Sequence, residues 1–291
     1  MIDESRVANE QPTVGEWASA GTQVLPPEQR HGVLERMVTA RWPVALVVAG
    51  CLVGAWQLMG ALGRLPVYVL SPAEVVSAVW SYLTDGTLSE AAVVSLRRLA
   101  VGFAIGAGLG VTLGLLAGVV PLFHAVIDPL VSFTFPLPKI ALFPPIALWL
   151  GFSDRAIWLV IALACFYPSF INAVAGTRGI DRHHLWVAGN LTAGHWRTFW
   201  QVVFPAALPR LLVGVRISLA LSFVMVFATE AISSRPGLGS VIVESYQFLR
   251  YDRMYAAIAV LAVLGLIADR LLVWIARSGT RGHDIAAVGR G

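Results

Sequence analysis

Residues 181–209, DRHHLWVAGNLTAGHWRTFWQVVFPAALP, form a polar segment with a helical pattern between two long apolar segments. It predicts a short helix capped by Asp181. The apolar face of this helix is formed by Leu185, Ala188 and Leu191. A turn near residues 192–194 and a second amphipathic piece that stops before Pro205 are expected to follow. Two small helices held at both ends by apolar segments are expected to lie outside a bilayer, at its surface.

Composition indicates the class of protein. Of the 291 residues, 57% are hydrophobic and 13% are charged, and the mean hydropathy is +0.73. Because soluble domains carry about 25% charged residues, we expect an all-α polytopic membrane protein. Segments of about 20 apolar residues predict six transmembrane helices, near residues 43–63, 99–119, 129–151, 156–176, 208–231 and 254–276.

The two ends of the chain are polar. Residues 1–41 carry charges of both signs and no apolar core, which favours a cytosolic tail over a cleaved signal peptide. Residues 42–277 form the expected transmembrane domain, and residues 278–291 form a second tail. Six spans put both tails on one side, and an excess of arginines near the span ends indicates that this side is cytosolic. The sequence has no basic patch interleaved with aromatic residues, so it does not indicate binding to nucleic acid.

A short helix is expected between the first two spans. Ser71-Pro72-Ala73-Glu74 is a capping box with proline at the first helical position. The apolar stripe that follows is formed by Val75, Val76, Val79, Trp80 and Leu83. This stripe predicts that the helix lies against the membrane surface or against the bundle.

The second span has a glycine at every fourth position. These glycines are Gly102, Gly106, Gly110, Gly114 and Gly118. Residues at this spacing share one helix face, and small residues let another helix approach closely within a membrane. The pattern predicts a helix interface, with a partner in this chain or in a second copy. Arg97 and Arg98 precede these glycines and are expected at the outer interface, where basic side chains snorkel to water.

The third span is interrupted by prolines. These are Pro129, Pro136, Pro138, Pro144 and Pro145. Broken helices occur at membrane depth where protein or a water-filled cavity satisfies the backbone, so the segment is expected to line the route or a subunit interface. Lys139, the only lysine, falls near its middle, where a cation costs about 2.5 to 3.5 kcal/mol. Two interpretations remain open: an electrostatic role in the pathway, and snorkelling or pairing with Asp128.

A loop after the fifth span carries a weaker signal. Glu230 closes that span, and Gly237 and Gly239 follow within Pro236-Gly237-Leu238-Gly239. Both a role beside a gate and a plain interfacial turn fit this pattern. His183 and His184 are adjacent and would point about 100° apart on a helix without a third ligand, so no metal site is predicted.

Five motifs resemble the permeases of ATP-binding cassette (ABC) importers. They are Leu70-Ser71-Pro72, Ser95-Leu96-Arg97-Arg98, Pro138-Lys139-Ile140-Ala141-Leu142, Pro205-Ala206-Ala207-Leu208-Pro209 and Pro236-Gly237-Leu238-Gly239. The resemblance implies a type I importer transmembrane domain in which residues 181–209 are the coupling loop. The family's acidic residue and glycine in that loop fall on Trp186 and Thr192, and Gly194 can supply the turn. The implied docking residues are Leu185, Trp186, Ala188, Leu191, Thr192, Gly194 and Trp196.

The resemblance also implies the partners. Two permease copies would form a homodimer in the lipid bilayer of the bacterial inner membrane, with two ATP-binding cassette subunits inside and an extracytoplasmic substrate-binding protein outside. No Gly-x-x-x-x-Gly-Lys-Ser/Thr motif occurs, so the chain is expected to be no enzyme and to hold no cofactor, with ATP and Mg²⁺ on the partner ATPase. The motifs are most similar to the branch for nitrate, taurine, sulfonates and bicarbonate, and sulfonates are the first candidates. The implied pathway or gate residues are Lys139, Glu230, Gly237 and Gly239.

Two other classes of membrane protein have comparable spans. An intramembrane serine protease of rhomboid type has six, but Ser240 lacks the Gly-x-Ser-Gly context and no histidine falls in the last span. A self-sufficient secondary carrier could form from two half-size chains, but it needs coupling carboxylates at mid-membrane, and none is clearly placed there. The carrier remains the alternative to the importer permease.

Overall fold

The computed structural model describes residues 41–180 and 194–279, and every regular element in these ranges is a helix. The chain divides into two compact units, residues 1–55 and 56–291. The described part of the first unit is the beginning of helix α3 (Arg41–Ala61). Apolar side chains cover this helix on all sides, as expected of a helix that crosses a bilayer.

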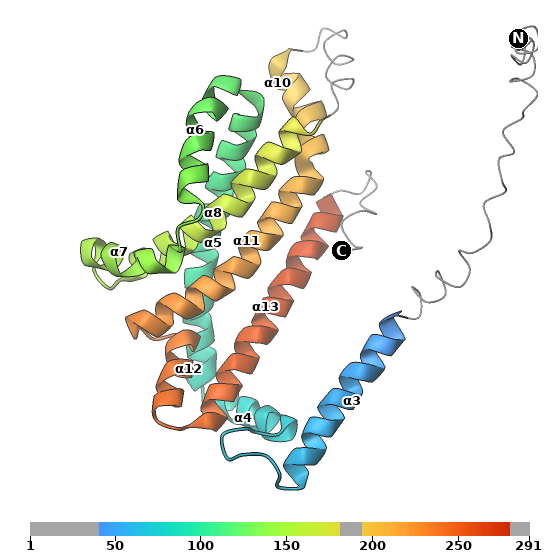
Figure 1. Cartoon of the computed structure of the whole chain (residues 1–291), viewed down its shortest axis with the longest axis vertical. Helices are drawn as coiled ribbons and strands as arrows, with labels where there is room; N and C mark the ends of the chain where they lie inside the picture. The colour runs from blue at the N-terminus through green and yellow to red at the C-terminus, as the bar shows by residue number, and fades with distance from the viewer. Residues whose placement is uncertain (1–40, 181–193, 280–291) are drawn as a thin grey trace, which may run out of the picture. The chain divides into compact units, whose positions relative to one another are not determined.

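The second unit contains the helical bundle, in which α5, α8, α11 and α13 are the long helices (Figure 1). Helix α5 packs mainly on α8, and α8 packs on α11. The helices after α3 are α4 (Pro72–Thr84), α5 (Thr87–Val119), α6 (Pro121–Thr134), the 3-10 helix η2 (Lys139–Leu142), α7 (Phe143–Leu150), α8 (Asp154–Arg178), α10 (His195–Thr198), the π-helix η3 (Phe199–Val203), α11 (Phe204–Ser233), α12 (Leu238–Gln247) and α13 (Tyr251–Gly279).

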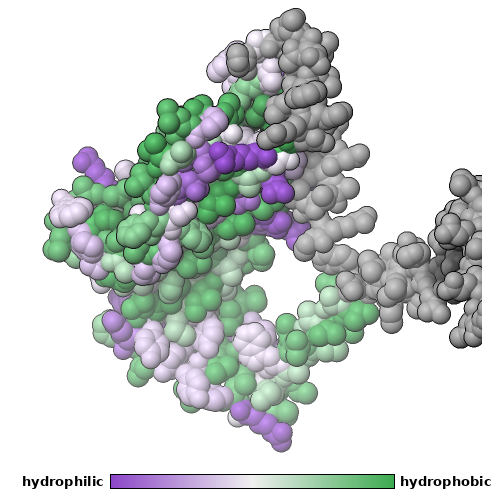
Figure 2. All heavy atoms as spheres, turned by 45° about the horizontal axis from the view of Figure 1, so that its top comes forward, coloured by the Kyte–Doolittle hydropathy of each residue, from purple (hydrophilic) through white to green (hydrophobic). Residues whose placement is uncertain are grey.

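The expectation of an all-α polytopic membrane protein is confirmed for the described residues. Five helices are long and apolar enough to cross a membrane, and a sixth candidate is the pair Pro121–Thr134 and Lys139–Leu150, which is bent by 90°. The predicted third span is therefore a broken one. Hydrophobic side chains cover much of the surface shown in Figure 2, as contact with lipid requires.

The second span begins earlier than predicted, at Thr87 rather than near residue 99. A left-handed turn at Gly86 (φ 88°) separates α4 from α5. The Asp85 carboxylate accepts hydrogen bonds from the Thr87 backbone N–H (2.9 Å) and hydroxyl (2.6 Å), which start the helix and lower the pKa of Asp85. Residues 87–98 lie outside the predicted span because their polar members interrupt the apolar run, but they form the first turns of α5.

The expected stop before Pro205 is wrong. Helices α10, η3 and α11 follow one another without a break from His195 to Ser233. At the junction the backbone N–H of Phe204 donates to the carbonyl of Phe199, which is the wider hydrogen bonding of a π-turn. Pro205 then falls in the first turn of α11, directly after the π-turn, so the change in hydrogen bonding and the proline occur at the same place in the helix.

The predicted capping box is confirmed. The Glu74 carboxylate accepts a hydrogen bond from the Ser71 backbone N–H (2.7 Å), and the Ser71 hydroxyl accepts one from the Glu74 N–H (3.5 Å). The first of these contacts lowers the pKa of Glu74. Helix α4 packs on the bundle through Ala78, Val79 and Tyr82. The predicted apolar stripe is therefore divided between a face on the bundle and an outward face.

The glycine face of α5 lies against α8 of the same chain. A Cβ atom at Gly102 would lie 2.6 Å from the Cβ of Ile161, and one at Gly110 would lie 2.5 Å from the carbonyl oxygen of Phe166. Gly106, Gly114 and Gly118 meet α8 in the same way. Gly108, which is outside this register, has no atom within 4 Å of a built Cβ. The glycines at every fourth position thus allow the backbone of α5 to approach α8 closely.

Candidate functional site

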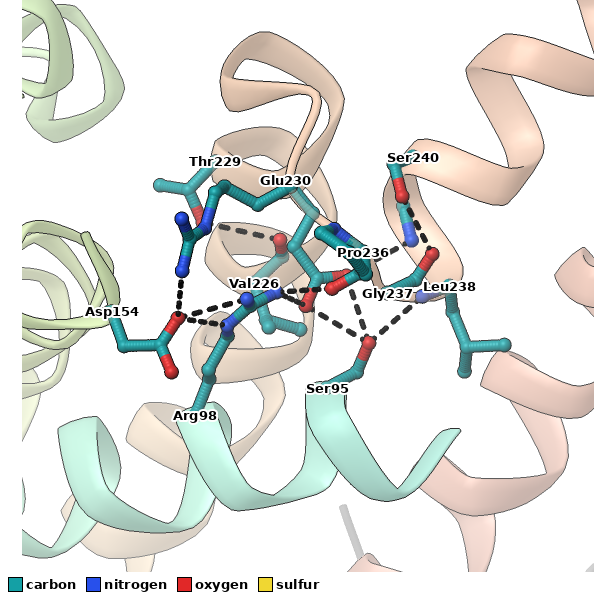
Figure 3. Close-up of polar contacts among 12 residues, drawn as sticks. Ser95, Arg98, Asp154, Val226, Thr229, Glu230, Pro236, Gly237, Leu238 and Ser240 are labelled. Carbon is teal, nitrogen blue, oxygen red and sulfur yellow. Dashed lines mark hydrogen bonds and ion pairs between the residues drawn. The ribbon is translucent and has the colours of Figure 1, made fainter. Parts of the chain in front are cut away.

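A buried network of charged and polar groups joins four helices where α8 begins (Figure 3). Helix α5 supplies Ser95 and Arg98, which are three residues apart and share a face. Asp154 is the first residue of α8, and Glu230 lies in the last turn of α11. The turn before α12 adds backbone groups. We call this set the ionic network.

Arg98 is the centre of the ionic network, and its side chain is only 3% exposed. Its Nη1 donates to Glu230 Oε1 at 2.8 Å and to the carbonyl oxygen of Pro236 at 2.6 Å. Its Nε donates to Asp154 Oδ1 at 2.9 Å, and Nη2 lies 2.8 Å from the same oxygen. The planar guanidinium thus holds two carboxylates and a backbone carbonyl in fixed directions, which a lysine ammonium does not do.

Glu230 is completely buried. Besides Arg98, its carboxylate accepts hydrogen bonds from the Ser95 hydroxyl (2.8 Å to Oε2) and from the backbone N–H of Gly239 (3.0 Å). The Ser95 hydroxyl oxygen in turn accepts a hydrogen bond from the backbone N–H of Leu238 (2.9 Å). Removing one partner of a buried ion pair costs about 3 to 5 kcal/mol, because the other charge is left uncompensated.

Gly237 and Gly239 leave space for the Glu230 side chain because they have no side chains of their own. A Cβ atom at Gly237 would collide with this carboxylate, and one at Gly239 would lie 2.8 Å from the Cβ of Glu230 and 2.5 Å from the carbonyl oxygen of Phe227. The φ of 161° at Gly237 is ordinary extended backbone, so the requirement for glycine is one of space. The turn can approach α11 only because neither residue has a side chain.

The ionic network opens toward solvent at Asp154, whose side chain is 21% exposed. Arg97 Nη2 lies 3.2 Å from Asp154 Oδ2, and Arg235 Nη2 lies 3.6 Å from Oδ1. Three guanidinium groups therefore surround two carboxylates at this site. Such an arrangement carries no nucleophile or acid-base pair, but it fixes the relative position of four helices.

Sequence reasoning identified only part of this site. The structure brings Glu230, Gly237 and Gly239 together, but Ser95, Arg98 and Asp154 were not among the expected site residues. The expectation that Arg98 snorkels to water is wrong, since it is buried, whereas Arg97 is 69% exposed. Arg98 lies four residues before Gly102 and therefore continues the glycine register toward α8, which is the signal that could have revealed its burial.

Lys139 lies elsewhere, at the bend of the broken span. Its Nζ donates to the backbone carbonyls of Thr134 (3.2 Å) and Phe135, at the end of α6, and lies 4.1 Å from the centroid of the Tyr167 ring. Lysine contacts of this kind satisfy the last carbonyls of a helix. Pairing with Asp128 is not observed, because Asp128 lies 3.6 Å from Nε2 of His124 instead.

The expected docking residues Leu185, Trp186, Ala188, Leu191 and Thr192 lie outside the described residues. Gly194 is exposed and immediately precedes α10, and Trp196 in that helix is 75% exposed. The Trp196 ring packs against Trp200 in an edge-to-face contact (centroids 5.9 Å apart). An exposed aromatic cluster therefore stands at the end of the α10–α11 helix remote from the ionic network.

An all-helical bundle with a broken span and charges buried between its helices has the features of a membrane transport protein. Residues 110–280 match the family model described as binding-protein-dependent transport system inner membrane component. The chain belongs to this family.

Curated relatives agree with this assignment. The putative aliphatic sulfonates transport permease protein SsuC of Bacillus subtilis is 33% identical over 78% of this chain and 83% of its own length. The taurine transport system permease protein TauC of Escherichia coli is 27% identical over 89% of this chain and 98% of its own length. A solved structure of the MetNI methionine ABC transporter shares the fold, with a TM-score of 0.53 and 18% identity, over 67% of this chain and 97% of that chain.

The interpretation as an ABC importer permease is therefore confirmed. The chain is a multi-pass translocation subunit, and in this class ATP hydrolysis belongs to a separate subunit. Membership of the family implies in general an ATPase, a substrate-binding protein and a second permease.

Proposed function

We propose that this permease forms the pathway for a small organic sulfonate or a similar small oxyanion. The observation that carries the proposal is the similarity to two relatives named for aliphatic sulfonates and for taurine, over more than three quarters of this chain. The guanidinium groups of Arg97 and Arg235 at the exposed edge of the ionic network support it, since they favour anions near the bundle.

The proposed importer contains two copies of this chain and two ATP-binding subunits, which carry the ATP and Mg²⁺. The ATP-binding subunits would dock on residues 182–203, and an extracytoplasmic binding protein would deliver substrate at the opposite end. Both termini would lie in the cytosol of a bacterium. The exposed Trp196 supports this topology, because α10 lies at the end of α11 opposite α12 (Figure 1).

The unbroken helix from α10 through α11 suggests how movement of the coupling loop would reach the other end of the bundle. A displacement of the coupling loop, when ATP closes the motor dimer, would be carried along α11 to Glu230 in its last turn. There the ionic network ties α11 to α5, to α8 and to the turn at Gly237 and Gly239. Glu230 and the two glycines would thus anchor a gate-side turn, so that the outer mouth and the coupling loop move together.

Lys139 would act at a third place in the same protein. Its contacts with the last carbonyls of α6 and with the Tyr167 ring support a role in holding the bend of the broken span. The backbone at this bend has few helical partners, so it must face protein or water rather than lipid. We propose that the bend, and Lys139 with it, lie beside the translocation pathway.

Uptake of labelled ethanesulfonate tests the proposal. Cells expressing this chain with its ATP-binding and binding-protein partners should take up ethanesulfonate in an energy-dependent manner, with nitrate as the competitor. Ala188→Glu should abolish uptake while the protein still inserts, because a charge then enters the docking contact. Transport of nitrate without any sulfonate would refute the sulfonate assignment, and full uptake by the Ala188→Glu variant would refute docking at this loop.

A further inference from the structure

An ion pair joins α11 and α13, which run side by side in the bundle (Figure 1). Arg216 Nε donates to Asp269 Oδ1 at 2.6 Å, and Arg216 Nη2 donates to Asp269 Oδ2 at 3.0 Å. This is the bidentate arrangement of a guanidinium on a carboxylate, which fixes the direction of both groups. The two side chains are nevertheless 48% and 32% exposed, unlike Arg98 and Glu230 in the ionic network. The pair is therefore held in place without being buried.

The pair lies well away from the ends of both helices. At about 1.5 Å per residue, Arg216 is about 18 Å from Phe204 and about 26 Å from Ser233 along α11. Asp269 is about 27 Å from the first residue of α13 and about 15 Å from its last. The hydrocarbon core of a bilayer is about 30 Å thick, and both helices are longer than this. The pair therefore lies within the apolar part of the membrane, in its cytosolic half on the proposed topology.

Lipid is an unsuitable neighbour for these two side chains. Charged groups at membrane depth face protein or a water-filled cavity, because hydrocarbon does not hydrate them. Asp269 has a single methylene group, so its carboxylate does not reach the membrane surface by snorkelling. The nearby exposed side chains Val213 and Ile217 on α11 and Leu271 on α13 are apolar and suit lipid. The pair differs from them, so its exposed side lies against water or against another protein.

The unused donors of Arg216 favour water over a dry protein contact. A guanidinium has five N–H groups, and Asp269 accepts from Nε and Nη2 only. Nη1 has no acceptor within residues 41–180 and 194–279. In a dry contact between two copies its N–H groups would lose their hydrogen bonds to water, which is costly. In a water-filled route they are hydrated while the route is empty and are free to meet an anion that enters it.

We propose that Arg216 lines the translocation pathway and donates hydrogen bonds from Nη1 to the anionic head of the passing solute. Asp269 is a positioning residue, which holds the guanidinium plane and offsets its charge, so that the anion is contacted but is free to leave. The inference rests on the proposed function and adds the residue of this chain that contacts the oxyanion. Arg216 is about 21 Å from Glu230 along α11, so this contact is separate from the ionic network.

Uptake of labelled ethanesulfonate by cells expressing the whole importer tests the inference. The double variant Arg216→Gln/Asp269→Asn leaves no uncompensated charge, so it should insert and melt like the wild type. Its uptake should fall about tenfold, the loss expected when a hydrogen bond from a charged donor is removed. Uptake equal to that of the wild type would mean that the pair only stabilises the bundle, and would overturn the inference. A wild type that takes up no ethanesulfonate would overturn the proposed function instead.

Arg270→Gln is the matched control. Arg270 follows Asp269 in the chain, is exposed, and forms no ion pair within the described part of the chain. Its long side chain is free to snorkel toward the inner membrane surface, so its replacement should leave uptake unchanged. Equal losses in Arg270→Gln and in the double variant would indicate a general effect of positive charge, and would overturn the contact at Arg216.

Thiol labelling tests separately whether the pair faces water. In a chain carrying Cys51→Ala and Cys165→Ala, the variant Arg216→Cys/Asp269→Asn should react with an impermeant sulfonate thiol reagent in permeabilised cells. Leu271→Cys should not react, because Leu271 lies two residues beyond Asp269 on another face of α13 and is exposed among apolar neighbours. Protection of the cysteine at position 216, or its disulfide with a second copy, would assign this face to a protein contact and overturn the inference.

Discussion

The two halves of helix α5 hold the bundle together by different means. From Gly102 to Gly118, α5 lies against α8 through a face without side chains. One turn earlier, Arg98 on the same face reaches two carboxylates from α8 and α11. Lipid offers no hydrophobic driving force between helices, so both halves must use other interactions. The glycine half relies on close packing of backbones, and the other half adds directed charge to the packing of Leu88, Ala91 and Ala92.

The difference determines how each half tolerates change. Packing along the glycine face is spread over five positions, so the loss at one position is partial. The ionic network depends on a single guanidinium that serves Glu230, Asp154 and the carbonyl of Pro236. We therefore expect graded effects along the glycines and a large effect at Arg98.

The largest effect is expected for Arg98→Met. This variant leaves the buried Glu230 carboxylate without its cation, and the loss should be about 3 to 5 kcal/mol. The melting temperature and the yield of the protein purified in detergent should both fall sharply. The double variant Arg98→Met/Glu230→Gln should recover part of the loss, because the uncompensated charge is then removed. A melting temperature for Arg98→Met equal to that of the wild type would show that the ionic network does not stabilise the folded protein.

An intermediate effect is expected for Gly110→Leu. The new side chain meets the backbone of Phe166 and the Cβ of Ser169, and overpacking of this kind costs about 1 to 3 kcal/mol. Gly108→Leu is the matched control, because it makes the same change in helix propensity with nothing within 4 Å. Melting temperatures of the two variants should therefore diverge. Equal losses in both would remove close packing on α8 as the explanation.

The smallest effect is expected for Tyr82→Phe. This variant removes an exposed hydrogen bond, so it tests whether burial makes the contacts of the ionic network stronger. The Tyr82 hydroxyl donates to Asp252 Oδ2 at 2.7 Å in an exposed contact, and this hydrogen bond raises the pKa of Tyr82. A raised pKa means that the neutral phenol stabilises the folded state. This contribution is present below the ordinary value of about 10 and is lost as the pH rises through the raised value.

Wild type should therefore exceed Tyr82→Phe in stability by less than about 1 kcal/mol at pH 8. Heat denaturation at a series of pH values should show the difference disappearing above pH 10. A loss in this variant as large as that of Arg98→Met would mean that burial does not explain the strength of the ionic network.

Local features of the fold could be predicted from the sequence. The capping box at Ser71 involves residues three apart, and the glycine register lies within one helix, so both patterns are visible without the fold. The broken third span followed from its prolines, because a proline removes a backbone donor wherever it lies. The π-turn before Pro205 was missed, since no residue type specifies it and proline alone predicts a stop.

The candidate site could be predicted only in part, because its members are distant in sequence. Arg98 meets Asp154 across 56 residues and Glu230 across 132 residues. Pattern reasoning placed Glu230 beside Gly237 and Gly239, which are its neighbours along the chain. It assigned Arg98 to water, because an isolated arginine at the end of an apolar run snorkels by default. Only the packing of α5 on α8 and α11 shows that the Arg98 side chain is buried.

The same separation has a consequence for biosynthesis. Ribosomes add about 5 to 20 residues per second, so Glu230 is made roughly ten seconds after Arg98, given the 132 residues between them. During this interval α5 can enter the bilayer, but its guanidinium has no buried carboxylate to meet. Asp154 can pair with Arg98 once α8 has been made, but the completely buried contact with Glu230 forms only when α11 arrives. The contact between α5 and α11 therefore forms late in membrane insertion. The N-terminal half of the bundle reaches its final packing only after the C-terminal half has been made.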